Sequence, residues 1–154
     1  MKGIDLLQKH TASAVVIRAW FLEKMIESLQ TSDVPDDFKN MMRETGIEDD
    51  KLAIMIDANP RMLLDVFDKH DIIIYFMIFS SPQGVKFSGA IHTGNDEVKP
   101  NPIGKQCNTR KEAEAFAIEA AIEILEDKLK EARMNIIGQN GNTGEHYDET
   151  IKQE

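Results

Sequence analysis

The side chains that could do chemistry are few and widely separated along this sequence. Asp65 and Asp68 are spaced i, i+3 and could hold a cation, but a pair of acids on a helix is more often simply solvated. Ser80 and Ser81 stand in no nucleophile-elbow pattern. The histidines and the single cysteine do not have the spacing of zinc ligands: His10, His70, His92, Cys107 and His146. We therefore predict no catalytic residue, no metal site and no cofactor.

The charged residues are distributed unevenly. The formal net charge is -9 over 154 residues, which disfavours a general affinity for phosphate backbones. Residues 72–85 contain no charged side chain, whereas residues 86–111 contain five basic and two acidic ones. If the chain binds nucleic acid, the candidate site is this basic segment, through Lys86, Lys99, Lys105, Arg110 and Lys111.

Length and composition fit one globular domain. A chain of 154 residues with 42% hydrophobic and 29% charged residues can bury a sizeable core without disulfides. A single cysteine excludes an intrachain disulfide framework and fits a reducing compartment. The N-terminus lacks the apolar core of a signal peptide, and the run IIIYFMIF is far shorter than the roughly 20 residues that span a bilayer. We expect a soluble, acidic, cytoplasmic protein without a membrane segment.

The first 58 residues predict a layer of helices. In residues 11–30, apolar side chains recur at helical spacing: Val15, Ala19, Leu22, Ile26 and Leu29. Residues 34–46 follow with Pro35 and two acids at the start and Gly46 as a stop. Residues 48–58 repeat the acidic start, as is typical of a helix N-terminus.

Residues 60–133 predict an αβββα unit. Asn59 and Pro60 are typical of an N-cap and a first helical position. Residues 72–80 are apolar on both faces, which favours a strand covered on both sides or buried at the centre of the sheet. After the turn SPQG, residues 85–93 alternate as a second strand. Two prolines in residues 97–107 favour an edge strand or an irregular return.

The closing helix has the clearest pattern in the chain. Thr109 and Glu112 form the T-x-x-E capping box with which a helix begins. The stripe that follows is rich in alanine, which indicates close approach to a sheet: Ala113, Ala117, Ala120 and Ile124. Glu126 and Lys130 are expected to form an exposed pair. Residues 135–154, rich in glycine and asparagine, are expected to form a flexible tail.

Together these elements predict an α+β fold in a single domain, residues 1–134. The N-terminal helices, residues 1–58, pack on a small antiparallel three-stranded sheet, and a long C-terminal helix covers that sheet.

The αβββα unit resembles the double-stranded RNA-binding domain in the order of its elements and in the text TRKEAEAFAIEAAIEIL. The residues on the positions of that family's Ser/Thr-Lys-Lys-x-Ala-type motif are Thr109, Arg110, Lys111 and Ala113. The resemblance implies that the basic pair contacts phosphates across the RNA groove. The chain departs from the family at Glu114, where the family has a further lysine, and in its short SSPQG loop.

Two further resemblances concern the closing helix. It is similar to helices of small uncharacterised proteins from phages and mobile elements, which implies no mechanism. Three strands followed by this helix also resemble the first half of a ribonuclease H domain. That nuclease needs a metal-binding acid on its first strand, and residues 72–80 contain none.

These observations favour a non-catalytic protein that binds a protein partner or a second copy of itself. The main reason is the lack of converging catalytic groups, together with an acidic helical half able to present a docking face. The alternative is double-stranded RNA binding through residues 86–111. An enzyme that holds a metal with scattered acids is a third class.

Overall fold

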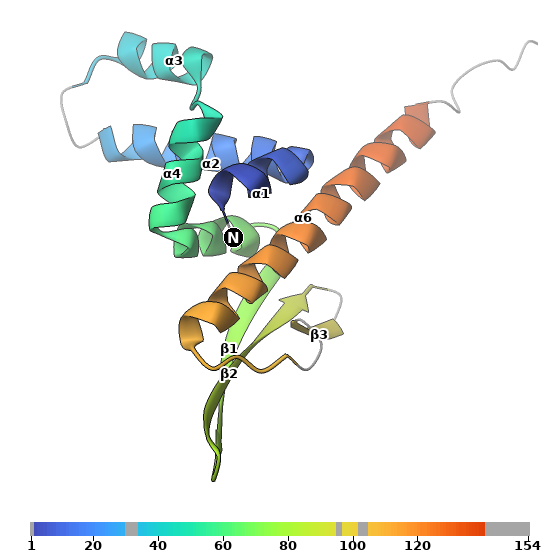
Figure 1. Ribbon diagram of the computed structural model, residues 1–154. Helices are drawn as coiled ribbons and strands as arrows, with labels where there is room; N and C mark the ends of the chain where they lie inside the picture. The colour runs from blue at the N-terminus through green and yellow to red at the C-terminus, as the bar shows by residue number, and fades with distance from the viewer. Residues whose placement is uncertain (1, 30–33, 95–96, 102–104, 141–154) are drawn as a thin grey trace, which may run out of the picture.

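The computed structural model describes residues 2–29, 34–94, 97–101 and 105–140, without the side chains of residues 81, 97–101 and 138–140. Helices gather at one end of the molecule, a β-hairpin projects at the other, and one long helix runs past both (Figure 1). The predicted α+β class is confirmed.

The N-terminal half is helical, as its sequence pattern predicts. Its helices are α1 (Gly3–Lys9), α2 (Thr11–Leu29), α3 (Asp36–Thr45) and α4 (Asp49–Ala58). The expected stop after α3 is confirmed, because Gly46 takes a φ of 72° and its N–H donates to the Met42 carbonyl at 2.9 Å. Helix α1 lies very close to α4: a Cβ on Gly3 would stand 2.5 Å from the Ala53 carbonyl oxygen.

The next segment differs from the predicted single helix. It begins as a 3₁₀ turn, η1 (Pro60–Leu63), and continues as the short helix α5 (Leu64–Asp68). Asn59 is the N-cap residue and Pro60 the first helical residue, as predicted, but the Asn59 side chain makes no capping hydrogen bond. The Asn59 carbonyl instead accepts the N–H of Met62 at 3.1 Å, which is the i to i+3 bond of a 3₁₀ turn.

The sheet is built on a long antiparallel hairpin. Strands β1 (Ile72–Ser81) and β2 (Gly84–Thr93) pair along their full length, with Ile74 opposite Ile91 and Ile78 opposite Phe87. The short β3 (Glu97–Asn101) pairs with the end of β2. Strand β1 therefore lies at the edge of the sheet, with β2 on one side only. The prediction that residues 72–80 are buried at the sheet centre or covered on both faces is wrong.

The core lies where the helical layer, the base of the hairpin and α6 (Arg110–Asn140) meet. Its largest fully buried side chains come from all three parts: Phe21, Ile17, Leu52, Ile56, Phe67, Ile72, Ile91, Ile118, Ile122 and Leu125. Burial falls along β1 from the base to the tip: Ile72 is 0% exposed and Ile78 is 68% exposed. The β1 strand is therefore least buried near the hairpin tip.

Helix α6 begins at the predicted capping box. The Glu112 N–H donates to Thr109 Oγ1 at 3.2 Å, and the Thr109 N–H donates to Glu112 Oε2 at 3.3 Å. The close approach that the alanines predict is also present, because a Cβ on Gly89 of β2 would stand 2.7 Å from the Ala117 Cβ. The helix continues to Asn140, beyond the expected boundary at residue 134. The remainder of the expected tail, residues 141–154, lies outside the described residues.

Candidate functional site

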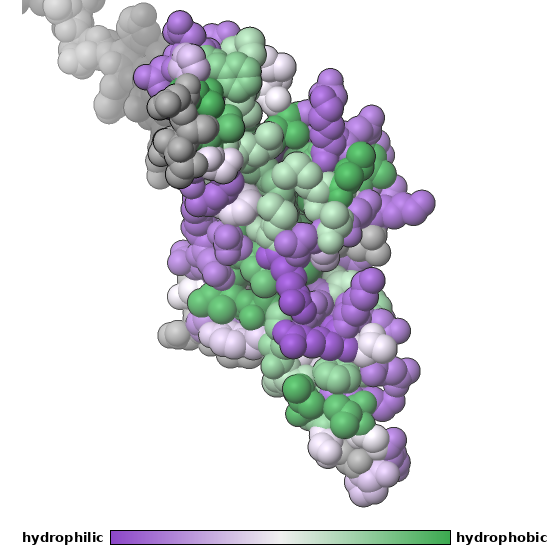
Figure 2. All heavy atoms as spheres, turned by 90° about the vertical axis from the view of Figure 1, so that its left-hand side faces the viewer, coloured by the Kyte–Doolittle hydropathy of each residue, from purple (hydrophilic) through white to green (hydrophobic). Residues whose placement is uncertain are grey.

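The largest exposed apolar surface of the β-region lies on the hairpin. Because side chains alternate along a strand, the odd-numbered residues of β1 share the face turned away from α6. We define the hairpin surface as six large apolar residues that are each 37–68% exposed: Ile73, Tyr75, Met77, Ile78, Phe79 and Val85. Hydrophobic residues reach the surface along this projecting lower end of the molecule (Figure 2). No charged residue interrupts the sequence from 72 to 85.

The segment before α6 pairs with β2 on the side of that strand away from β1. The backbones of Phe87 and Cys107 exchange hydrogen bonds of 3.0 and 2.7 Å, which hold this segment against β2. The Ser88 hydroxyl also donates to the Lys105 carbonyl at 3.1 Å. Ser88 and Ala90 on β2 are buried, whereas their partners on β1, Met77 and Tyr75, are 37% and 49% exposed. The outer face is therefore buried along β2 and exposed along β1.

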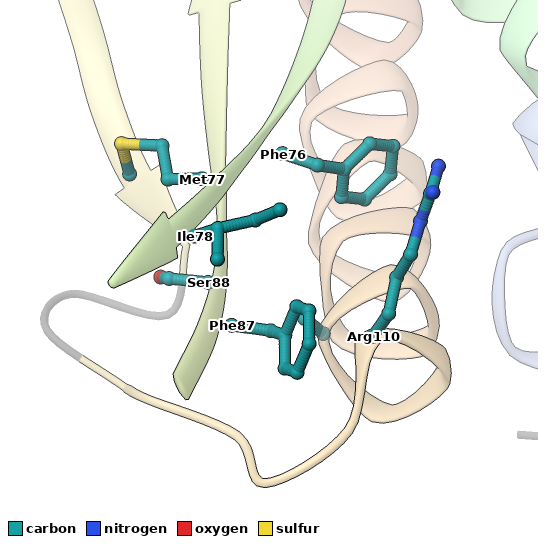
Figure 3. Close-up of a pocket in the computed structure, with 7 residues that line it drawn as sticks. Phe76, Met77, Ile78, Phe87, Ser88 and Arg110 are labelled. Carbon is teal, nitrogen blue, oxygen red and sulfur yellow. The ribbon is translucent and has the colours of Figure 1, made fainter. Parts of the chain in front are cut away.

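A small apolar cavity of about 150 Å³ lies between the hairpin and the start of α6. Phe76 and Phe87 point toward α6, whereas Met77 and Ser88 point away from it (Figure 3). Arg110 stands at the cavity and supplies its one charged group. Pockets for small-molecule ligands usually measure about 300–1,000 Å³. This cavity is too small for a typical substrate and is best described as a gap under a loosely covered hairpin.

The structure brings four of the five predicted basic residues near one another and pairs three of them within the chain. Lys86 donates to Asn108 Oδ1. The Lys105 ammonium lies 3.2 Å from the centre of the Phe116 ring, as a cation–π contact. Arg110 donates to Glu114 at 2.7 Å. Lys111 is exposed, and the side chain of Lys99 lies outside the described residues.

Glu114 is the residue around which the start of α6 is organised. Its carboxylate, 9% exposed, accepts hydrogen bonds from Arg61 at 2.6 and 3.0 Å as well as the bond from Arg110. The hydrogen bond from Arg61 is the main cause that holds the pKa of Glu114 below its ordinary value, so the carboxylate is charged at neutral pH. This anion occupies the position where the RNA-binding family has a lysine, and it neutralises the neighbouring Arg110.

A second hollow, of about 380 Å³, lies beside Lys2, Asp57, Lys111 and Glu114. Its carboxylates already have partners: Asp57 Oδ1 accepts the Gly3 N–H at 2.7 Å, and Glu114 binds the two arginines. In the part of the chain that the structure describes, no three His, Cys, Asp or Glu side chains gather as a metal site requires.

The sequence pattern did not predict that the hairpin surface is exposed. A strand buried on both faces and a strand exposed for contact with a partner have the same β-branched and aromatic composition. The signal that could have separated them is the absence of charge through the turn as well: residues 80–85 extend the neutral run to a hairpin tip.

Comparison with protein-family models, with curated proteins and with solved structures finds no match for this chain. None of the helices in the described residues is both long enough and apolar enough to span a bilayer.

Proposed function

We propose that this chain is a non-catalytic interaction protein, which binds a protein partner or a second copy of itself through the hairpin surface. The observation that carries the proposal is the exposure of six large apolar side chains in or beside an uncharged stretch, residues 72–85. Ile73, Tyr75, Met77 and Phe79 share the outer face of β1, and exposed apolar patches on a protein surface mark interaction sites. The hairpin also stands out from the rest of the chain, whose net charge of -9 keeps most surfaces polar.

Several features support a binding role over catalysis. The cavity under the hairpin is small and apolar, and the carboxylates of the larger hollow are paired within the chain. The outer face of β1, which is turned away from α6, is open to a partner. Tyr, Phe, Met and Ile side chains offer large contact areas, and aromatic residues and Met are enriched at interfaces.

Binding of double-stranded RNA through residues 86–111 has weaker support. Three of its five cations have partners within the chain, namely Asn108, Phe116 and Glu114. Affinity for a phosphate backbone depends on cations that are free to replace counterions. The acid Glu114 among these cations opposes an approaching phosphate.

The test compares wild type with a hairpin variant, Ile78→Lys plus Phe79→Lys. These positions are 68% and 41% exposed, so the variant should keep the wild-type circular dichroism spectrum and thermal midpoint. Sedimentation would follow self-association, and chemical cross-linking with mass spectrometry would identify partners of the chain in its source cells. We expect self-association or one defined partner for wild type, and its loss in the variant. If wild type shows neither, or if the variant binds equally well, the proposed function is wrong.

A further inference from the structure

The open edge of β1 distinguishes the hairpin surface from an ordinary apolar patch. Strand β1 pairs with β2 along ten residues, and among the described residues no strand lies on its other side. An edge strand presents a row of main-chain N–H and carbonyl groups that another strand can pair with. Natural edges are usually short or blocked by charged residues and prolines. Residues 72–81 contain neither a charge nor a proline.

Resting on the proposed function, we propose that the partner is a second copy of this chain. The two β1 strands pair antiparallel about a twofold axis near Met77, which joins the two sheets into one. An antiparallel pair of identical strands is self-complementary, because each copy supplies the same row of donors and acceptors.

The distribution of charge favours a second copy over an unrelated partner at this edge. Two copies that each carry a net charge of -9 repel one another, and contact through a neutral segment places no like charges opposite each other. Phe38 and Met41, which are also exposed, share α3 with Asp36, Asp37 and Glu44. Copies that met at α3 would bring those acids together.

The alternation of side chains restricts the register. If the two copies form one continuous sheet, residues opposite each other must lie on the same face, so one residue of β1 must stand opposite itself. With Met77 at the axis, Tyr75 stands opposite Phe79 of the second copy, and Ile78 stands opposite Phe76. This register places the aromatic rings of Tyr75 and Phe79 opposite each other, and it brings Ile78 and Phe79, near the tip, into contact with the second copy.

The geometry also keeps the two helical layers apart. The base of each hairpin, at Ile72, lies five residues from Met77, or about 17 Å along the strand. In an antiparallel pair the two bases point in opposite directions, so the helical layers sit at opposite ends of the joined sheet.

The exposed apolar side chains of β1 add cross-strand contacts to the main-chain hydrogen bonds of the paired edge. Five of these side chains are 37–68% exposed. Edge pairing buries part of that area, because both faces of the joined sheet stay open, so we expect a dimer of modest affinity.

Single cysteine substitutions in the full chain test the register directly. Opposite residues of an antiparallel pair have Cα atoms about 4.5–5.5 Å apart, within reach of a disulfide. We expect Met77→Cys to form a disulfide-linked dimer rapidly under mild oxidation. Tyr75→Cys and Phe79→Cys should each remain monomeric on denaturing gels when oxidised alone, since like positions would lie about 13 Å apart. A mixture of these two variants should cross-link. Wild type, whose Cys107 is buried, is the control.

Sedimentation equilibrium gives the second readout. Met77→Lys places two like charges opposite each other at the axis and should weaken the dimer about tenfold or more. Ile54→Lys, at a 68% exposed position on α4, is the matched control and should leave the dimer unchanged. Circular dichroism would show that both variants are folded.

The outcomes separate this inference from the proposed function. A dimer that Met77→Lys leaves intact, or that shows no Met77→Cys cross-link, overturns edge pairing while self-association stands. A monomer at all concentrations that binds another protein through the hairpin overturns the second copy as partner. A monomer without any hairpin-dependent partner overturns both.

Discussion

At the scale of single residues, buried carboxylates connect segments that are distant in the sequence. Glu126 on α6 was expected in an exposed pair with Lys130, and the pair exists at 3.3 Å, but the Glu126 side chain is only 4% exposed. Its two oxygens accept the N–H groups of Ala12 at 3.3 Å and Ser13 at 2.8 Å. These are two of the otherwise unpaired N–H groups at the start of α2. Glu126 thus acts as an N-cap supplied by another helix.

The first prediction concerns the dependence of this contact on pH. Burial of Glu126 raises its pKa, but the hydrogen bonds from Ser13 and Ala12 together outweigh burial, so the pKa lies below its ordinary 4.5. A lowered carboxyl pKa contributes stability above about pH 4.5, and that contribution is lost as the pH falls through the folded-state value. We expect Glu126→Gln to lower the free energy of unfolding by about 1 kcal/mol at pH 7.

Urea unfolding at pH 7 and at pH 3.5 would measure both effects. The difference between wild type and Glu126→Gln should shrink at the lower pH. The control is Glu123→Gln, on the same helix as Glu126, which removes an exposed ion pair with Lys9 of α1. This change should lower the free energy of unfolding by no more than about 0.5 kcal/mol. Equal losses for the two variants would contradict a capping role for Glu126.

The second prediction concerns the contact between Gly89 and Ala117. A Cβ at residue 89 would lie 2.7 Å from the Ala117 Cβ, closer than two carbon atoms can approach. Gly89→Ala should therefore destabilise the protein by about 1–3 kcal/mol through overpacking. Ala117→Gly should cost about 1 kcal/mol on its own as a helix defect. The double variant should cost less than the sum of the two, as thermal unfolding would show. Simple additivity would mean that the sheet and α6 are not in close contact here.

At the scale of elements, the start of α6 is organised by ion pairs within the chain. The capping box orients the first turn, and the Glu114 carboxylate then binds Arg110 of its own helix and Arg61 of η1. The same ion pairs that attach η1 to α6 neutralise Arg110, one of the basic residues predicted to contact nucleic acid.

The third prediction follows from that pairing. We expect no specific binding of double-stranded RNA, and any affinity should be weaker than about 10⁻⁵ M at physiological salt, within the non-specific range. An electrophoretic mobility series would measure it, with Arg110→Glu plus Lys111→Glu as the matched variant. Tight binding that this variant abolishes would favour the RNA-binding alternative over the proposed function. Tight binding that survives in the variant would place an RNA site elsewhere on the chain.

At the scale of the whole molecule, the buried core lies at the centre and exposed apolar side chains lie toward the extremities. The helical layer, the base of the hairpin and the middle of α6 share one core. The hairpin tip extends beyond that core, and so does the last part of α6, where Met134, Ile136 and Ile137 are 60–71% exposed. The exposed apolar side chains of the hairpin and of the last part of α6 are therefore placed where another molecule could contact them.

The fourth prediction is a thermal midpoint that depends on protein concentration. A native state that dimerises is stabilised by mass action, whereas a monomer is not. For a dimer of chains this long, each tenfold increase in concentration should raise the midpoint by about 2 °C. Scanning calorimetry over two decades of concentration would measure the slope. The same scans of Met77→Lys should show almost no dependence, and an equal slope in both proteins would place the contact away from β1.

The sequence by itself determined the local structure, because local structure depends on neighbours along the chain. The periodicity of residues 11–29, Gly46 as a helix stop and the capping box at Thr109 and Glu112 each act within a few residues. The α+β class follows from the order of such elements.

Only the tertiary structure decided which apolar residues are buried and which charged residues are free. Residues 72–80 have the composition of a buried strand, but their place at the sheet edge, with one face turned away from α6, leaves that outer face exposed. Glu114 and Glu126 have the spacing of solvated helix residues, but each lies against a group from a distant part of the chain. Burial and pairing of this kind depend on long-range packing, which the hydrophobic pattern of one segment does not specify.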